Sequence, residues 1–298
     1  MIKTNYFQSK LILLFKGILF FVFFYLLIDR SENIDFDRVK VHNFSWLVLC
    51  FILTFLNWYF EWIKWQLILN QIDENENPNN LKAFASGIIA SFLTPSLSGN
   101  FLGRMFYYDK SKRWKITVFS LMANLSQFLV AIIFGLLAIE FTSKVFSFTT
   151  NPFILYFVLF FGVIFFFYFE KIGKLVPINK VQLLSNQIEN GPSRLKLILI
   201  STARYFIFVL QYMFALKAFG QVLSFDLIGL IGLIFLLITL TPSLFFGKIL
   251  IRETIAVAVF SMAGFVSAPA LFASFTTWFF NLFLTALIAL FLVKKTRK

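Results

Sequence analysis

Three residues in the apolar stretch 45–70 have side chains that could carry chemistry. Asn57, Glu61 and Lys64 are spaced at i, i+4 and i+7, which places them on one face of a helix. An ionisable group costs about 2.5–3.5 kcal/mol at the centre of a bilayer, so such residues mark functional sites. Glu61 and Lys64 are close enough on that face to pair. The alternative is an interfacial belt of Trp and Lys anchors, which we favour for Lys64, whereas both interpretations stay open for Asn57 and Glu61.

Two arginines follow prolines in other apolar stretches. Arg104 comes nine residues after Pro95, and Arg252 comes ten residues after Pro242. A proline ends the helix before it, and the unpaired N–H groups that start the next helix bind anions. An arginine there can hold a phosphate with two hydrogen bonds, so both breaks predict a site for a lipid phosphate. The alternatives are a cytoplasmic anchor for Arg104 and a surface pair of Arg252 with Glu253.

A further apolar stretch, 197–216, carries Arg204 and Gln211 seven residues apart on one helix face. We expect Gln211 to point into a helix bundle. Arg204 lies near the start of the stretch, where its long side chain can also extend to the membrane interface.

Other chemistries are excluded by the residue types present. With one cysteine, Cys50, the chain forms no internal disulfide and no cysteine metal site. One histidine, His42, leaves no histidine cluster for zinc, and its polar surroundings argue against a Ser–His–Asp site. No phosphate-binding loop of the nucleotide type occurs. We therefore expect neither an enzyme nor a cofactor.

The elements that must position these residues are membrane helices. The chain has 298 residues, of which 59% are hydrophobic and 14% charged, too few polar groups to cover a soluble protein. Its length holds about seven to nine hydrophobic segments. The net charge of +13 indicates loops that face anionic lipid rather than a nucleic-acid partner. The apolar windows are 11–28, 45–70, 81–108, 116–139, 152–169, 197–216, 226–262 and 266–293.

An internal repeat is indicated by a recurring motif. Thr-Pro-Ser-Leu occurs at 94–97 and again at 241–244, an offset of 147 residues, and the windows on either side match at the same offset. We expect one membrane domain, 1–298, with repeat halves at approximately 11–141 and 151–293.

The distribution of basic residues predicts the topology. The segments 1–16, 104–115, 171–196 and 294–298 hold 17 Lys and Arg residues, against 5 in the other connections. The positive-inside rule then places both termini in the cytoplasm. Windows 81–108 and 226–262 each begin and end on one side, so we expect two re-entrant hairpins from opposite faces and about six full spans. Complete spans at both breaks are the alternative, but 81–108 is too short for two.

These motifs resemble a known family. The run from Ala90 to Arg104 resembles the Pro…Gly-Glu…Arg signature of the lysylphosphatidylglycerol synthase transmembrane-region (flippase-like) family, and Thr241 to Glu253 resembles its second signature, Pro…Gly-x-Arg-Glu. The resemblance covers roughly residues 10–293. Asn100 stands where the family usually has Glu, and Leu250 where it has Gly. From the spacing arguments and the resemblance together, the candidate substrate-binding residues are Pro95, Gly99, Asn100, Arg104, Pro242, Arg252, Glu253, Asn57, Glu61, Arg204 and Gln211.

The function expected from these features is lipid translocation. The opposed broken helices, their arginines and the resemblance predict a translocase for a phospholipid or polyprenyl-linked lipid, with an anionic headgroup, in the bacterial inner membrane. The family's best-known members add a cytosolic aminoacyl-transferase domain, whereas only residues 294–298 follow the last window here, so we expect no transferase. The alternative is a non-transporting scaffold that assists a lipid-modifying enzyme or glycosyltransferase. Besides lipids, a second copy of the chain or such an enzyme is the expected partner.

Overall fold

The computed structural model describes residues 40–94, 98–142, 153–175, 191–241 and 247–294, together with Tyr25, Gln182 and Asn186. Apart from Tyr25, the first expected span (11–28) lies outside these residues, as do Pro95 and Pro242. Within the described part the chain is helical and contains no strand, which confirms the all-α class.

The helices follow the apolar windows of the sequence. Four of those described are long and apolar enough to cross a membrane: α2, α5, α8 and the continuous run from α11 through α12. Their bounds are α2 (Phe44–Asn70), α3 (Asn80–Leu93), α4 (Ser98–Met105), α5 (Lys110–Thr142), α6 (Phe153–Leu175), α8 (Arg194–Ala218), α9 (Phe225–Leu240), α10 (Gly247–Met262), α11 (Ser267–Trp278), the π-helix η2 (Phe279–Leu284) and α12 (Thr285–Lys294).

Local capping marks where α2 and α8 begin and where α8 ends. The side-chain oxygen of Asn43 accepts a hydrogen bond from the Ser45 N–H at the start of α2, and Ser193 does the same for Lys196 at the start of α8. After α8 the chain turns at Gly220, whose φ of +85° suits glycine. A Cβ at Gly220 would also lie 2.5 Å from the ring of His42.

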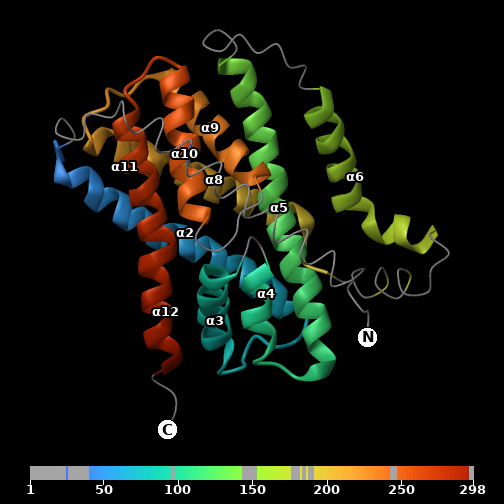
Figure 1. The fold of residues 1–298 in the computed structure, drawn as a ribbon. Helices are drawn as coiled ribbons and strands as arrows, with labels where there is room; N and C mark the ends of the chain where they lie inside the picture. Colours follow the sequence, from blue (N-terminus) through green and yellow to red (C-terminus); the bar gives the residue numbers. More distant parts are fainter. Residues whose placement is uncertain are drawn as a thin grey trace.

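The helices pack in definite pairs. α2 lies along α8, α5 along α9 and α12 along α3, while α3 packs on α4 and α10 packs on both α9 and α11. In Figure 1 the α3–α4 pair occupies the lower half of the molecule and α9 and α10 the upper half, with the long α5 extending between these levels. α6 stands at the side, against α5.

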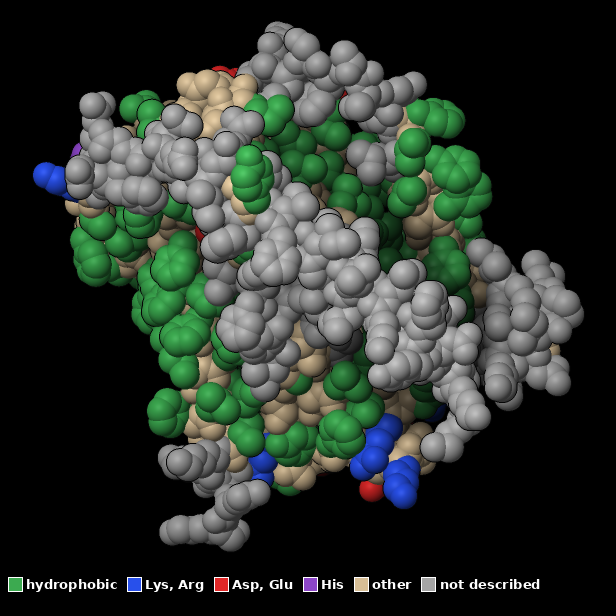
Figure 2. All heavy atoms as spheres, in the orientation of Figure 1, with side chains coloured by type: hydrophobic (Ala, Val, Ile, Leu, Met, Phe, Trp, Pro, Cys, Tyr) green, Lys and Arg blue, Asp and Glu red, His purple; other side chains and the backbone are tan. Residues whose placement is uncertain are grey.

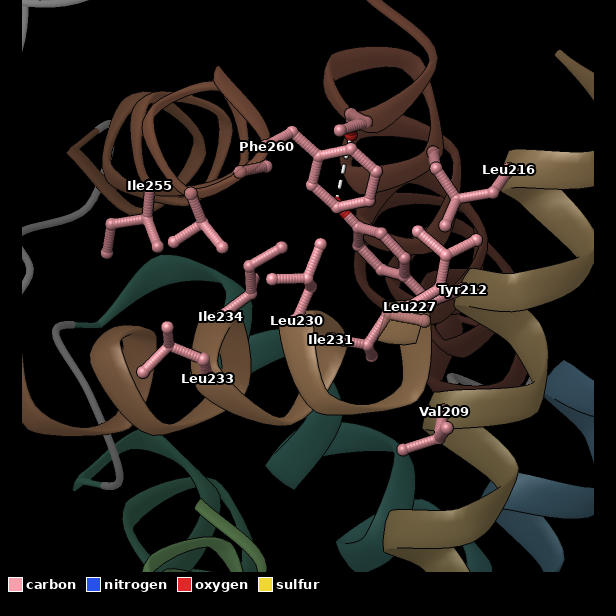
Figure 3. Packing of buried hydrophobic residues seen from close by; sticks show 14 of the residues in the cluster. Val209, Tyr212, Leu216, Leu227, Leu230, Ile231, Leu233, Ile234, Ile255 and Phe260 are labelled. Carbon is pink, nitrogen blue, oxygen red and sulfur yellow. Dashed lines mark hydrogen bonds between the residues drawn. The ribbon is translucent and has the colours of Figure 1, made fainter. Parts of the chain in front are cut away.

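The larger apolar core lies among α8, α9, α10 and α11. In Figure 3, Leu230 and Ile234 of α9 point toward Phe260 and Ile255 of α10, and Tyr212 of α8 closes one end. The Tyr212 hydroxyl donates to the Ala270 carbonyl oxygen at 2.9 Å, so this buried phenol keeps a hydrogen bond.

The outer surface is largely apolar. Large hydrophobic side chains are exposed on α2, α5, α6, α8 and α12, and Figure 2 shows them over much of the visible described face, with Lys and Arg side chains at its lower edge. A soluble monomer does not expose apolar surface on this scale. Contact with lipid chains explains it.

Candidate functional site

The carboxylate of Glu61 is held by two arginines from different helices. Arg104 of α4 places Nη2 3.0 Å from Oε1, and Arg204 of α8 binds Oε2 through Nη1. Asn100 of α4 adds a hydrogen bond from Nδ2 to Oε1 at 3.1 Å. The site therefore joins α2, α4 and α8, and both carboxylate oxygens have partners.

Arg104 is buried rather than anchored at a surface, so the alternative of a cytoplasmic anchor is wrong. The residue is 1% exposed, and its guanidinium lies 4.7 Å from the ring centroid of Trp65 and 5.1 Å from that of Phe84. These rings attract the cation while excluding water. Its Nε has no hydrogen-bond partner among the described residues, so this arginine retains an unused donor.

Close packing of α3 against α4 puts Arg104 in place. A Cβ on Gly103 would overlap the carbonyl oxygen of Ser86 on α3. A Cβ on Gly87 would come within 2.7 Å of Asn100 Oδ1 and 2.8 Å of Arg104 Nε. Glycine at these two positions is therefore a steric requirement of the site.

Lys64 occupies the interior, which makes its interpretation as an interfacial anchor wrong. It is 1% exposed, and its Nζ donates at 3.3 Å to both the Ala123 carbonyl oxygen and Gln127 Oε1. The pairing with Glu61 that the spacing allows is not formed either, because the two arginines bind that carboxylate. They leave one excess positive charge beside Glu61, and a protonated Lys64 adds a second.

A chain of side-chain amides continues from this cluster. Arg204 Nε donates to Asn57 Oδ1 at 2.9 Å, so this arginine points inward instead of extending to the interface. Asn57 Nδ2 donates to Asn281 Oδ1 at 2.8 Å, and Asn281 Nδ2 donates to Gln211 Oε1 at 3.0 Å. The amides thus connect α2, α8 and η2 through the buried interior.

The last amide of this series, Gln211, bonds to α2. Gln211 Nε2 donates to the Cys50 carbonyl oxygen at 2.9 Å and to Thr54 Oγ1 at 3.0 Å. The expectation that Gln211 points into the bundle is confirmed, since it is fully buried.

Asn281 is a site residue that the sequence analysis missed. It is the one amide side chain in the window 266–293, which holds no charged residue. A single amide in so apolar a window could have identified Asn281 as a site residue. It lies in η2, where the helix widens to the π form. Single π turns inside helices are frequent at functional sites.

Arg252 and Glu253 form a second cluster in which Glu253 is buried and Arg252 partly buried, so a surface pair is the wrong interpretation. Glu253 is 5% exposed, and neither carboxylate oxygen has a hydrogen-bond partner among the described residues. Arg252 donates from Nη2 to Thr277 Oγ1 at 3.2 Å. Thr277 also accepts, at its carbonyl oxygen, a 2.9 Å bond from Asn281 Nδ2, which joins the two clusters.

The structure brings together most of the residues singled out by sequence. The Glu61 cluster and its amide chain contain Asn57, Glu61, Asn100, Arg104, Arg204 and Gln211. Gly99 contributes no side chain, but a Cβ there would overlap the Ala90 carbonyl oxygen. The roles expected for Pro95 and Pro242 concern residues outside the described part.

A sequence model of the lysylphosphatidylglycerol synthase TM region matches residues 12–289. The chain belongs to this family. The match covers both arginine clusters and every described helix except the end of α12. No curated protein and no solved structure matches the chain. Family membership and the spanning helices make this a multi-pass membrane protein.

Proposed function

We propose that the protein is a translocase that moves a phospholipid or polyprenyl-linked lipid with an anionic headgroup across the bacterial inner membrane. The observation that carries the proposal is the buried ion cluster in which Arg104 and Arg204 share Glu61. Buried ionisable groups in a membrane protein are expensive and mark substrate pathways. The proposal is one of transport, not of catalysis.

The chemistry of the cluster favours a phosphate. Two guanidinium groups already hold two oxygens of one carboxylate, an arrangement that phosphate oxygens reproduce. The excess positive charge favours a ligand that brings negative charge. A phosphate entering the site would displace Glu61 from one or both arginines, and the unused Nε donor of Arg104 would be available to it.

The topology we propose has about six spans and two re-entrant hairpins, with repeat halves at 11–141 and 151–293 and both termini in the cytoplasm. Support comes from helix pairs that correspond between the two halves. The contact of α3 with α4 in the first half corresponds to that of α9 with α10 in the second. The contact of α5 with α9 likewise corresponds to that of α12 with α3. In Figure 1, α5 ascends from its first residue while α11 to α12 descends, as inverted halves require.

Reconstitution tests the proposal directly. Vesicles containing the purified protein receive an acyl-chain-labelled fluorescent phosphatidylglycerol, and an impermeant quencher reports how much label reaches the outer leaflet. We expect movement in the wild type and a loss greater than tenfold in Arg104→Ala and Arg204→Ala, because removing one partner of a buried charge pair costs about 2–5 kcal/mol.

A matched arginine controls for general damage. Arg113→Ala removes a guanidinium from the start of α5 whose Nε donates to the Tyr108 carbonyl oxygen, away from Glu61. We expect this variant to transport normally. Absence of lipid movement in the folded wild type would overturn the translocase and favour the scaffold that assists a membrane enzyme.

A further inference from the structure

Glu253 is a buried carboxyl group with no hydrogen bond at either oxygen among the described residues. It lies in the second turn of α10, it is 5% exposed, and both of its oxygens lack a partner within the described part of the chain. An ionised carboxylate in such a place would lose its hydration, and only the adjacent Arg252 and the Ser274 hydroxyl could compensate for it. A proton on the carboxyl group would remove this cost.

The charged and titratable groups around Glu253 are few. Arg252 is next to it on α10, Tyr212 approaches from α8, and α11 contributes the hydroxyl of Ser274. α11 has no charged residue, and the one acid of α9, Asp226, is exposed in that helix's first turn, at the end away from α10's start. Arg252 is thus the one cation near Glu253 among the side chains that the structure describes.

We propose that Glu253 is the proton-binding residue that couples proton exchange to lipid movement. This inference rests on the proposed function and names its energy source. In each cycle the Glu253 carboxylic acid releases one proton to water on one side of the membrane, and the carboxylate takes one proton from water on the other side. No other bond is made or broken.

Two arrangements of Arg252 follow from the protonation of Glu253. With the acid neutral, Arg252 Nη2 bonds Thr277 Oγ1 at 3.2 Å and its Nε has no partner, which is the arrangement observed. With the acid ionised, the carboxylate attracts the adjacent guanidinium, and a bond to it replaces the one to Thr277. The proton therefore decides whether α10 is tied to α11 at Thr277.

A continuous path carries this change to the lipid site. Thr277 accepts from Asn281, Asn281 accepts from Asn57, and Asn57 accepts from Arg204, which holds Glu61. Asn281 stands in the π-helix η2, whose wider turn admits a shift between two hydrogen-bond registers. Thr277 and Asn281 are positioning residues in this scheme.

The first test uses a pH gradient across the same vesicles. With one proton per lipid, a gradient of one pH unit supports up to about a tenfold difference of labelled lipid between leaflets. We expect this asymmetry in the wild type. In Glu253→Gln, which imitates the neutral acid, we expect equal amounts of labelled lipid in the two leaflets. Glu140→Gln is the matched control, since Glu140 is exposed and accepts a bond from Tyr156.

The outcomes separate this inference from the proposed function. Wild-type protein that moves lipid but distributes it equally under a gradient would overturn the coupling and leave the translocase intact. Asymmetry that survives in Glu253→Gln would overturn the role of Glu253. A wild type that moves no lipid at any pH would overturn the translocase, and the coupling with it.

A second readout does not depend on transport. Infrared spectra of the wild type at neutral pH should contain a protonated carboxylic acid C=O band that disappears in Glu253→Gln and persists in Glu140→Gln. Asn281→Ala should keep that band and yet lose the gradient-driven asymmetry. Identical spectra for wild type and Glu253→Gln would show that Glu253 carries no proton and would overturn the inference.

Discussion

Arg204 donates a 2.9 Å hydrogen bond from Nε to Oδ1 of Asn57, and the two residues are 147 positions apart. The two Thr-Pro-Ser-Leu motifs are separated by the same 147 positions. In the proposed repeat, Asn57 and Arg204 thus occupy corresponding places in α2 and α8, the helices that lie along each other. Corresponding residues of two related halves touch only near the axis that relates them. The contact supports placing the proposed repeat axis beside Glu61. Transporters that are built from inverted repeats bind their substrates at the interface between the repeats.

Removing the Asn57 side chain should destabilise the protein. Asn57→Ala leaves Arg204 Nε and Asn281 Oδ1 without their partner, and each orphaned buried group costs about 1–3 kcal/mol. Thermal unfolding in detergent measures the loss. Asn70→Ala, at an exposed amide where α2 ends, should stay within about 0.5 kcal/mol of the wild type. An equal loss in both variants would contradict the network.

A methyl group on Gly103 should disrupt the α3–α4 pair. Gly103→Ala introduces a Cβ that overlaps the Ser86 carbonyl oxygen, and a backbone atom cannot move aside cheaply. We expect the unfolding temperature and lipid movement to fall together, because α4 carries Arg104 and Asn100. Gly162→Ala is the control, since its Cβ would meet the flexible end of Leu129 at 3.0 Å. Unchanged stability in Gly103→Ala would refute the close approach.

Single cysteines should report the proposed sidedness. In a background lacking the buried Cys50, cysteines at the exposed positions Glu76 and Ser111 flank the α3–α4 pair on the same side. We expect both to resist an impermeant thiol reagent added to intact cells. A cysteine at Val222, which is 81% exposed between α8 and α9, should react. Reaction at only one of the two flanking positions would mean that the pair crosses the membrane completely.

Lowering the pH should remove the contribution of Glu74 to the stability of the folded protein. Lys112 Nζ bonds Glu74 Oε1 at 2.6 Å and Asn77 Nδ2 bonds Oε2 at 2.7 Å, and these bonds lower the pKa of Glu74. A lowered folded-state pKa stabilises the protein above the unfolded pKa, about 4.3, and the benefit is lost as pH falls through the folded value.

Glu74→Gln should therefore lower the unfolding temperature at neutral pH, and the difference from the wild type should close in acid. High salt should narrow the neutral-pH difference, since the pair is partly exposed. Glu76→Gln, at an exposed acid in the same loop, is the control. A difference that stays constant from pH 7 to about pH 3 would exclude this titration.

The helices and their breaks were predictable because both depend on local sequence. Apolar runs long enough to cross a bilayer became α2, α5 and α8, within a few residues of the expected windows. α3 ends at Leu93 and α9 at Leu240, each two residues before a proline. A proline restricts the residue before it whatever the tertiary context.

The residues that make up the site could be predicted from the sequence, but which of them bind one another could not. Glu61 and Arg104 stood out because a charged residue inside an apolar stretch is costly in a membrane, and such a residue can be recognised from the sequence alone. Proximity on one helix allows Lys64 to pair with Glu61, but Arg104 and Arg204 bind Glu61 from 43 and 143 residues away. Asn281 meets Asn57 across 224 residues.

Sequence alone determined the all-α membrane class, the helix windows and the residues too polar for their surroundings, since hydropathy, proline geometry and charge act over a few neighbouring positions. Only the tertiary structure decided that Lys64 is buried, that Glu61 binds two arginines and that Glu253 is buried beside Arg252. Those outcomes depend on which helix faces meet, and close contacts such as Gly103 against Ser86 fix that choice. The energy of such packing is the sum of many small contacts between segments that are far apart in the sequence, so it cannot be read from any short stretch of residues.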